Sequence, residues 1–317
     1  MNTAKQAPLP GGRWHFQHGP MDIVIAADGD PAAVQAAHAA AWVRFQPLLA
    51  ELVVELPLLR RPVAAGARCP LQGATARRMW LACAPLVQEA DGFITPMAAV
   101  AGAVAQELLV AYQRPGIHRA WVNNGGDIAL HLAPGQQARV GLYADLACFD
   151  GDALQRTASG QLRTDAGFTV QADQPVRGVA TSGWRGRSLS RGIADSVTVL
   201  AASAAMADAA ATVIANAVDV ADAGIQRRPA CEVRDDSDLG AIAVTVGVPV
   251  LPSAGVQQAL QAGLAVARRL QQRGLVQAAL LVCQGTMLRL PALPALPALP
   301  ALPALPVALP ASAAWVQ

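Results

Sequence analysis

An aspartate and a threonine stand four residues apart in the segment ADAAAT, at Asp208 and Thr212. The Ala-rich surroundings predict a helix, and residues four apart on a helix share one face, one turn from each other. A carboxylate and a hydroxyl in that arrangement can both present oxygen to a hard cation such as magnesium. They can equally do no more than hydrogen-bond neighbouring backbone, so the spacing alone leaves both interpretations open.

A second group of polar residues interrupts an apolar stretch in VNNGGDIALHL, residues 122–132. Asn-Gly and Gly-Asp pairs adopt the positive φ that a tight two-residue connection requires, so a turn between two strands is expected. Gly125 and Gly126 would also let a ligand approach the backbone, with Asn123 and Asp127 as polar contacts. The pattern indicates a turn and leaves a ligand-binding role open.

Hydroxyl and guanidinium groups gather in ATSGWRGRSLSRGIAD, residues 180–195. The hydroxyls belong to Thr181, Ser182, Ser188 and Ser190, and the positive charges to Arg185, Arg187 and Arg191. Together with glycine amides such as that of Gly183, these groups can hold a pyrophosphate. A flexible surface loop with its arginines in water is the alternative. Asp195 is compatible with orienting this loop, binding a metal or capping a turn.

The five histidines do not form a catalytic pattern. None has the spacing of an H-E-x-x-H zinc motif or accompanies a G-x-S-x-G nucleophile motif. His15, His18, His38, His118 and His131 are therefore expected to be surface or structural residues.

Composition excludes several classes of protein. The net charge is +2 with scattered Lys and Arg, unlike the basic stripe of a nucleic-acid binder. The five cysteines lie far apart without a C-x-x-C pair, which argues against a disulfide framework or a thiolate zinc site and fits a reducing compartment. No stretch resembles a signal peptide or a membrane span. A cytoplasmic protein with no nucleic-acid or membrane partner is expected.

Strands and helices that would position these groups alternate along the chain. A strand is predicted over 21–27, and a helix begins at Pro31 and continues to about Val54. Further helices are expected over 73–90, 96–113, 204–218 and 253–274, and strands over 119–124, 127–133, 138–144, 178–183, 195–203 and 276–285. Residues 150–176 are expected to form a loop. This content is typical of an α+β (mixed α/β) protein.

The two ends of the chain differ in amino-acid composition from the residues between them. Residues 1–20, rich in Pro and Gly, predict an irregular leader, and residues 288–317 form a Pro-Ala-Leu low-complexity tail. Proline at every third position removes backbone donors and favours an extended, polyproline-like arm. Such an arm either arises by repeat expansion or binds a groove on a partner, which would make the protein a scaffold.

Three segments, read together, resemble an uncharacterised branch of the ApbE-like superfamily, which takes its name from the FAD:protein FMN transferases. They are ITPMAAVAGAVA (residues 94–105), VNNGGDI (residues 122–128) and the long stretch from ATSG to VIAN (residues 180–216). The resemblance covers about residues 21–285 and implies an ApbE-like domain over 21–287. In that fold, small-residue helices pack on a mixed or antiparallel sheet.

The resemblance also implies ligands and partners. Magnesium would be held by Asp208, Thr212 and the backbone carbonyl of Ala98, with Asp208 also serving in catalysis. FAD would be ligand or substrate, and a Thr or Ser of an acceptor protein would receive FMN as AMP leaves. Contacts to the flavin nucleotide would come from Thr95, Met97, Ala101, Asn123, Gly125, Gly126, Asp127, Thr181, Ser182, Gly183, Ser188, Ser190 and Asp195.

The chain departs from the transferases at two places. In their D-x-G-A-x-A-K-G pattern, aligned on Gly102, Thr95 stands at the Asp and Ala101 at the Lys. Their His-Ile-Ile-Asp-Pro segment is replaced by SLSRGIAD, which contains no His. The alternative function is therefore a non-catalytic flavin- or nucleotide-binding protein that keeps the pocket and lacks the transfer chemistry.

Overall fold

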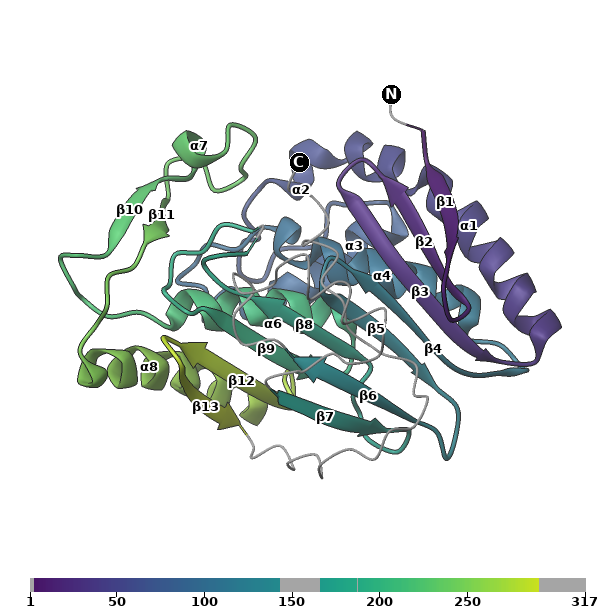
Figure 1. The fold of residues 1–317 in the computed structure, drawn as a ribbon. Coiled ribbons are helices and arrows are strands. Elements are labelled where there is room, and N and C mark those ends of the chain that lie inside the picture. The colour runs from purple at the N-terminus through teal and green to yellow at the C-terminus, as the bar shows by residue number, and fades with distance from the viewer. Residues whose placement is uncertain (1–2, 143–165, 187, 291–317) are drawn as a thin grey trace.

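The computed structural model describes residues 3–142, 166–186 and 188–290. A nine-stranded sheet forms its centre, with the order β1-β2-β3-β4-β5-β8-β9-β12-β13 and antiparallel neighbours throughout. The strands are β1 (Lys5–Leu9), β2 (Arg13–His18), β3 (Met21–Gly29), β4 (Ile117–Asn124), β5 (Asp127–Leu132), β8 (Gly178–Ser182), β9 (Ser196–Ala201), β12 (Ala278–Cys283) and β13 (Thr286–Leu290). The predicted α+β class with helices on an antiparallel sheet is confirmed (Figure 1).

Each face of the sheet has its own core. In β3, Ile23 and Ile25 join one cluster of buried residues while Val24 and Ala26 join the other, because successive residues of a strand point to opposite faces. Helices cover the first face, and the hairpin of β6 (Gln137–Leu142) and β7 (Ala166–Gln171) covers the second. The helices are α1 (Pro31–Val54), α2 (Leu56–Leu59), α3 (Ala74–Cys83), α4 (Val100–Leu109), α6 (Ala204–Ala217), α7 (Ala230–Val233) and α8 (Ser253–Gln272), with 3-10 turns η1 (Ala84–Leu86), η2 (Pro96–Ala99) and η3 (Val110–Tyr112).

Small side chains let α6 lie deep against its neighbours. Its alanines are buried almost throughout, and the side chain of Ser203 caps its first turn by accepting a hydrogen bond from the Met206 amide (3.3 Å). A Cβ atom at Gly178 in β8 would lie 2.2 Å from the carbonyl carbon of Ser203, so this strand and the start of α6 approach too closely for any side chain. The Ala-rich sequence is thus explained by close backbone packing.

The N-terminal segment differs from the irregular leader that its Pro and Gly content predicts, because residues 5–18 form β1 and β2 at one edge of the sheet. Proline is tolerated at an edge, where strand N–H groups can remain unpaired. Phe16 is fully buried and packs against Trp42 and Phe45 of α1, with ring centroids 5.1 and 5.4 Å apart. This aromatic contact attaches the segment to the core.

Other differences are smaller. Strand β7 occupies residues 166–171 of the predicted loop, and β13 adds a strand after the last one predicted. The expected tail beyond Leu290, the end of the strand expected over 138–144, residues 150–165 of the expected loop and Cys148 lie outside the described residues. Within the described part of the chain, the cysteines are unpaired and no helix is long and apolar enough to cross a membrane.

A separate two-stranded sheet, β10 (Gln226–Pro229) with β11 (Ala243–Gly247), projects from the body together with α7. Figure 1 shows these elements at the left, beyond the C-terminal end of α6. We call residues 219–250 the arm. It joins α6 to α8 and brings residues of its tip back towards the helices.

Candidate functional site

Helices α4 and α6 contact each other at Gly102 and Asp208. The Gly102 amide donates a hydrogen bond to the Asp208 Oδ2 atom (2.9 Å), and a Cβ at Gly102 would lie 2.2 Å from the Ala204 carbonyl oxygen. Only glycine fits this crossing without a shift of backbone. Thr212 follows one turn after Asp208 on α6, as the sequence predicts, and both side chains are partly buried.

A second carboxylate lies close to Asp208. Asp127 begins β5, is 8% exposed and accepts a hydrogen bond from the Thr181 amide (3.2 Å). Burial and then the charge of Asp127 raise the pKa of Asp208 well above its ordinary value, against the opposing hydrogen bonds from the Gly102 and Ala101 amides. Two carboxylates that repel each other in a partly dry place favour a cation between or beside them.

The glycine turn supports one side of this site. Gly125 and Gly126 have φ angles of +65° and +113°, and Asn124 pairs with Asp127 across a two-residue hairpin, so the predicted turn is confirmed. The Asn123 side chain accepts a hydrogen bond from the Gly126 amide (2.8 Å). The turn therefore holds Asp127 at the start of β5.

The turn is also tied to α4. Asn124 is buried, and its Nδ2 donates to the carbonyl oxygen of Ala101 (3.1 Å). Since Ala101 precedes Gly102, the residue that binds Asp208, the hairpin and the two helices form one hydrogen-bonded unit. The sequence predictions at Asn123, Asp127, Ala101 and Asp208 therefore fall in one place.

Residues of η2 form the next side of the site. Met97 and Ala98 pack against the helix-side core, and the Ala98 amide donates to the Thr95 carbonyl (3.1 Å). Thr95 is 2% exposed, and its hydroxyl donates to the carboxylate of Asp238 at the tip of the arm. The resemblance expects an aspartate at the position of Thr95. The carboxylate found beside this position comes instead from Asp238, in a distant segment of the chain.

The thiol of Cys83 lies between these groups. It donates to the Thr95 carbonyl (3.3 Å), and burial, followed by the charges of Asp208 and Asp238, raises its pKa well above the ordinary value. Both carboxylates therefore lie near one buried thiol. Asp238 is absent from the residues predicted from the sequence; the only local signal is the acidic run RDDSDLG, which also fits a solvated loop.

The segment after β8 is more firmly tied down than a free loop. The Asp195 carboxylate accepts hydrogen bonds from the Gln284 amide (2.5 Å) and Trp184 Nε1 (3.3 Å), and a Cβ at Gly183 would lie 2.4 Å from the Asp195 carbonyl oxygen. Of the roles open to Asp195, these contacts favour orienting the segment. Arg185 lies over the Trp184 ring, 4.9 Å from its centroid.

The predicted hydroxyl donors do not converge on one point. The Thr181 hydroxyl bonds to that of Thr198 (2.9 Å), Ser182 is partly exposed at the end of β8, and Ser188 is exposed. Ser190 is buried, and its hydroxyl donates to the Asn216 Oδ1 atom (3.0 Å) at the end of α6. Thr181 is thus near Asp127, whereas Ser190 belongs to a different region.

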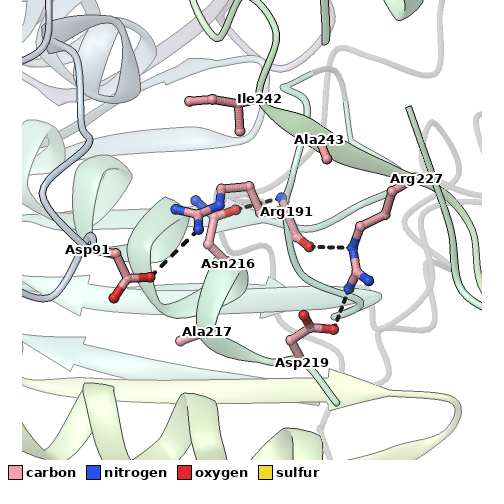
Figure 2. A pocket seen from close by; sticks show the side chains of 8 residues that line it. All are labelled: Asp91, Arg191, Asn216, Ala217, Asp219, Arg227, Ile242 and Ala243. Carbon is pink, nitrogen blue, oxygen red and sulfur yellow. Dashed lines mark hydrogen bonds and ion pairs between the residues drawn. The ribbon is translucent and has the colours of Figure 1, made fainter. Parts of the chain in front are cut away.

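That region is a cavity of about 450 Å³ between the arm and the C-terminal end of α6 (Figure 2). Its lining residues are Asp91, Arg191, Asn216, Ala217, Asp219, Arg227, Ile242 and Ala243. Figure 2 shows Arg191 directed towards Asp91 (3.7 Å) and Arg227 towards Asp219 (2.6 Å). The two positive charges are thus matched by two carboxylates.

The cavity is a poor pyrophosphate site in this arrangement. Asn216 lies eight residues after Asp208, about 12 Å along α6, and the C-terminal end of a helix carries partial negative charge. Arg187 lies outside the described residues. A pyrophosphate cradle around residues 183–191 therefore stays a prediction, and the groups near Asp208 are the better-supported candidate site.

Metal binding at this site would use few protein ligands. Within the described ranges, no group of three or more His, Cys, Asp and Glu is placed to hold a metal ion. The predicted set of Asp208, Thr212 and the Ala98 carbonyl consists of oxygen donors, which magnesium prefers. With Asp127 nearby, the charge and chemistry of these residues fit a hard cation.

Comparison with known proteins gives a family. The family model described as AbpE bacteria matches residues 6–289. A UPF0280 protein of Methanothermobacter thermautotrophicus is 41% identical over 130 residues, which are 41% of this chain and 44% of that protein. A UPF0280 protein of Methanospirillum hungatei is 34% identical over 155 residues, 49% of this chain and 55% of that protein. The chain thus spans about half the length of these relatives.

Several solved structures match most of this chain. The ApbE protein of Thermotoga maritima is 13% identical and has a TM-score of 0.48, and the match covers 91% of this chain and 97% of that one. The flavin transferase ApbE of Vibrio cholerae has 12% identity and a TM-score of 0.48 over 90% and 96% of the two chains.

Proposed function

The chain belongs to the AbpE bacteria family, within the ApbE-like superfamily that its motifs resemble, and from this we propose that it transfers FMN from FAD to a Thr or Ser hydroxyl of an acceptor protein. One observation carries the proposal: Asp208 and Asp127 come together at the crossing of α4 and α6. The pair supplies negative charge and oxygen ligands at one place, as a cation-assisted phosphoryl-type transfer needs.

Asp208, Thr212 and the Ala98 carbonyl would hold a magnesium ion, with Asp127 adding charge beside them. The ion would supply positive charge that stabilises the FAD pyrophosphate. Asp208 cannot move freely, because the Gly102 amide holds one of its carboxylate oxygens. Such fixed orientation is what a catalytic group contributes before the reaction begins.

In the reaction, the hydroxyl oxygen of the acceptor forms a bond to the FMN phosphorus. The bond from that phosphorus to the bridging oxygen breaks, and AMP leaves with the bridging oxygen. The hydroxyl proton passes to the carboxylate of Asp127, which lies beside Asp208 and is not one of the three magnesium ligands. Asp208, whose carboxylate is held by the Gly102 amide, would orient the attacking hydroxyl.

Incubation of the purified full chain with FAD and magnesium tests this proposal. Chromatography would follow AMP release, and bound flavin would be measured by absorbance after gel filtration. AMP release that requires both magnesium and Asp208 supports the transferase. Unchanged FAD in a stoichiometric complex would instead support the non-catalytic flavin-binding protein, and the absence of both AMP and bound flavin would contradict both functions.

A further inference from the structure

The tip of the arm contacts the beginning of η2 through two side chains that are 143 residues apart in sequence. The Thr95 hydroxyl donates to Oδ2 of Asp238. Thr95 is 2% exposed, so its hydroxyl needs a protein partner, and Asp238 provides a charged one. Asp236 is different: it is 71% exposed, and its pairing with Arg60 spans 3.8 Å.

Thr95 is also connected through its backbone to the candidate cation site. Its carbonyl oxygen accepts hydrogen bonds from the Ala98 amide (3.1 Å) and the Cys83 thiol (3.3 Å). Ala98 belongs to η2, which continues directly into α4, where Gly102 binds Asp208. A contact that fixes Thr95 therefore fixes the start of the backbone segment that runs past Asp208.

We propose that Asp238 is a positioning residue for the cation site. By accepting the hydrogen bond of the buried Thr95 hydroxyl, it holds η2 in the conformation that presents the Ala98 carbonyl and the Gly102 amide to the cation and to Asp208. Asp238 is not itself a ligand in this arrangement. The inference rests on the proposed function, because it assigns a role to the arm at the same site.

The arm thereby becomes part of the site although its strands lie apart from the central sheet. Residues that orient metal ligands by hydrogen bonds, without binding the metal themselves, typically lower metal affinity by about 10- to 100-fold when they are removed. Removal of either member of the Thr95–Asp238 pair should weaken the cation site by about tenfold or more on this basis.

Magnesium titration calorimetry on the full chain, with the metal alone as the probe, tests this inference. Thr95→Val removes the hydroxyl and keeps the negative charge of Asp238, whereas Asp238→Ala removes the carboxylate that accepts the hydrogen bond. Both are expected to weaken magnesium binding by about tenfold, and the double variant should be no weaker than the single ones. Asp236→Ala is the matched control, since it removes an equal carboxylate two residues away, and it should retain wild-type affinity.

The outcomes separate the possible roles of Asp238. If Asp238→Ala weakens binding and Thr95→Val does not, the effect comes from the charge of Asp238 and the positioning role is overturned. If the variants have lower melting temperatures but unchanged magnesium affinity, the Thr95–Asp238 contact only stabilises the fold, and the positioning role is overturned as well. Thr95→Ser keeps the hydroxyl and should bind magnesium as the wild type does. This result would show that the loss in Thr95→Val comes from the missing hydroxyl and not from a general loss of fold. A wild type that does not bind magnesium would overturn the cation site itself, whereas wild-type binding with unaffected variants overturns this inference alone.

Discussion

The backbone amide of Gly102 donates a 2.9 Å hydrogen bond to the carboxylate of Asp208, joining the first turn of α4 to α6. Amides in the first turn of a helix lack a partner within the helix. Asp208 supplies one from outside and also places negative charge where the helix dipole of α4 favours it. The candidate site is therefore built into the packing of two central helices.

Gly102→Ala should destabilise the protein. The added Cβ would lie 2.2 Å from the Ala204 carbonyl oxygen and 2.9 Å from the Asp208 Cβ, so the helices must separate. Overpacking of this kind costs about 1–3 kcal/mol in the free energy of unfolding, measured by urea denaturation. Gly255→Ala in α8 is the control: its nearest neighbour is Leu251 Cβ at 4.0 Å, and it should be neutral or stabilising. Equal stability of the two variants would rule out the close crossing.

Asp208 should make the metal-free protein less stable as pH rises. Its folded-state pKa lies well above the ordinary value of 3.8, mainly because the carboxyl group is buried and also because the negative charge of Asp127 lies nearby. The protonated form is favoured by folding, so its contribution is complete below that ordinary value and is lost as pH rises through the raised pKa. Urea denaturation of the wild type with a chelator present, at a series of pH values from below 3.8 upward, should show a fall in the free energy of unfolding. Asp208→Asn should not show this fall. Parallel pH profiles of wild type and variant would contradict the buried carboxylate pair.

Glu107 should have the opposite pH dependence. Burial disfavours its charge, but hydrogen bonds from Arg78 (2.5 Å) and Arg44 (2.7 Å) outweigh burial and lower its pKa below the ordinary value of 4.5. Its contribution to stability is present above that value and is lost as pH falls through the lowered pKa. Glu107→Gln should flatten the acid side of the stability profile.

Glu232→Gln is the control for Glu107→Gln. Its partner Arg228 lies 3.4 Å away and both side chains are more than half exposed, so the change should be within about 0.5 kcal/mol. An acid profile of Glu107→Gln that matches the wild type would show that the two arginine contacts do not form in solution.

Removal of residues 291–317 should leave the melting temperature unchanged, because the family match ends at residue 289 and β13 ends at Leu290. Removal from Thr286 onward is the informative comparison. It deletes β13, whose Leu288 and Leu290 pack against the helix-side core, and should lower the melting temperature clearly. A marked loss on the shorter deletion would mean that the tail contributes to the folded domain.

Local sequence pattern was enough to predict most of the fold because helix-start signals mark the helices and short apolar runs mark the inner strands, which are buried on both faces. The helix from Pro31 has proline in its first turn, and its N-cap Asp30 accepts hydrogen bonds from the Ala32 (2.9 Å) and Ala33 (3.0 Å) amides. The N-terminal hairpin was missed because its Pro and Gly suggested an irregular chain. The alternation of Trp14, Phe16 and His18 was the available strand signal.

The site was only partly predictable. The helical spacing of Asp208 and Thr212 is local and could be read directly, and the turn at Gly125 and Gly126 likewise. The approach of Asp127 to Asp208 depends on how a hairpin packs against α4 and α6, which no local pattern contains. Asp238 depends on the path of the arm, and its contact with Thr95 spans 143 residues.

Magnesium titration calorimetry with FAD present, on wild type and Asp208→Ala, tests the central claim most directly. The account predicts that the wild type binds magnesium, that folded Asp208→Ala gives no binding heat, and that Thr212→Val binds more weakly, because a neutral hydroxyl contributes less to a hard cation than a carboxylate does. Circular dichroism would confirm that Asp208→Ala keeps its helices, since alanine is the best helix former. Wild-type magnesium affinity in folded Asp208→Ala would contradict the cation site and, with it, the proposed flavin transfer.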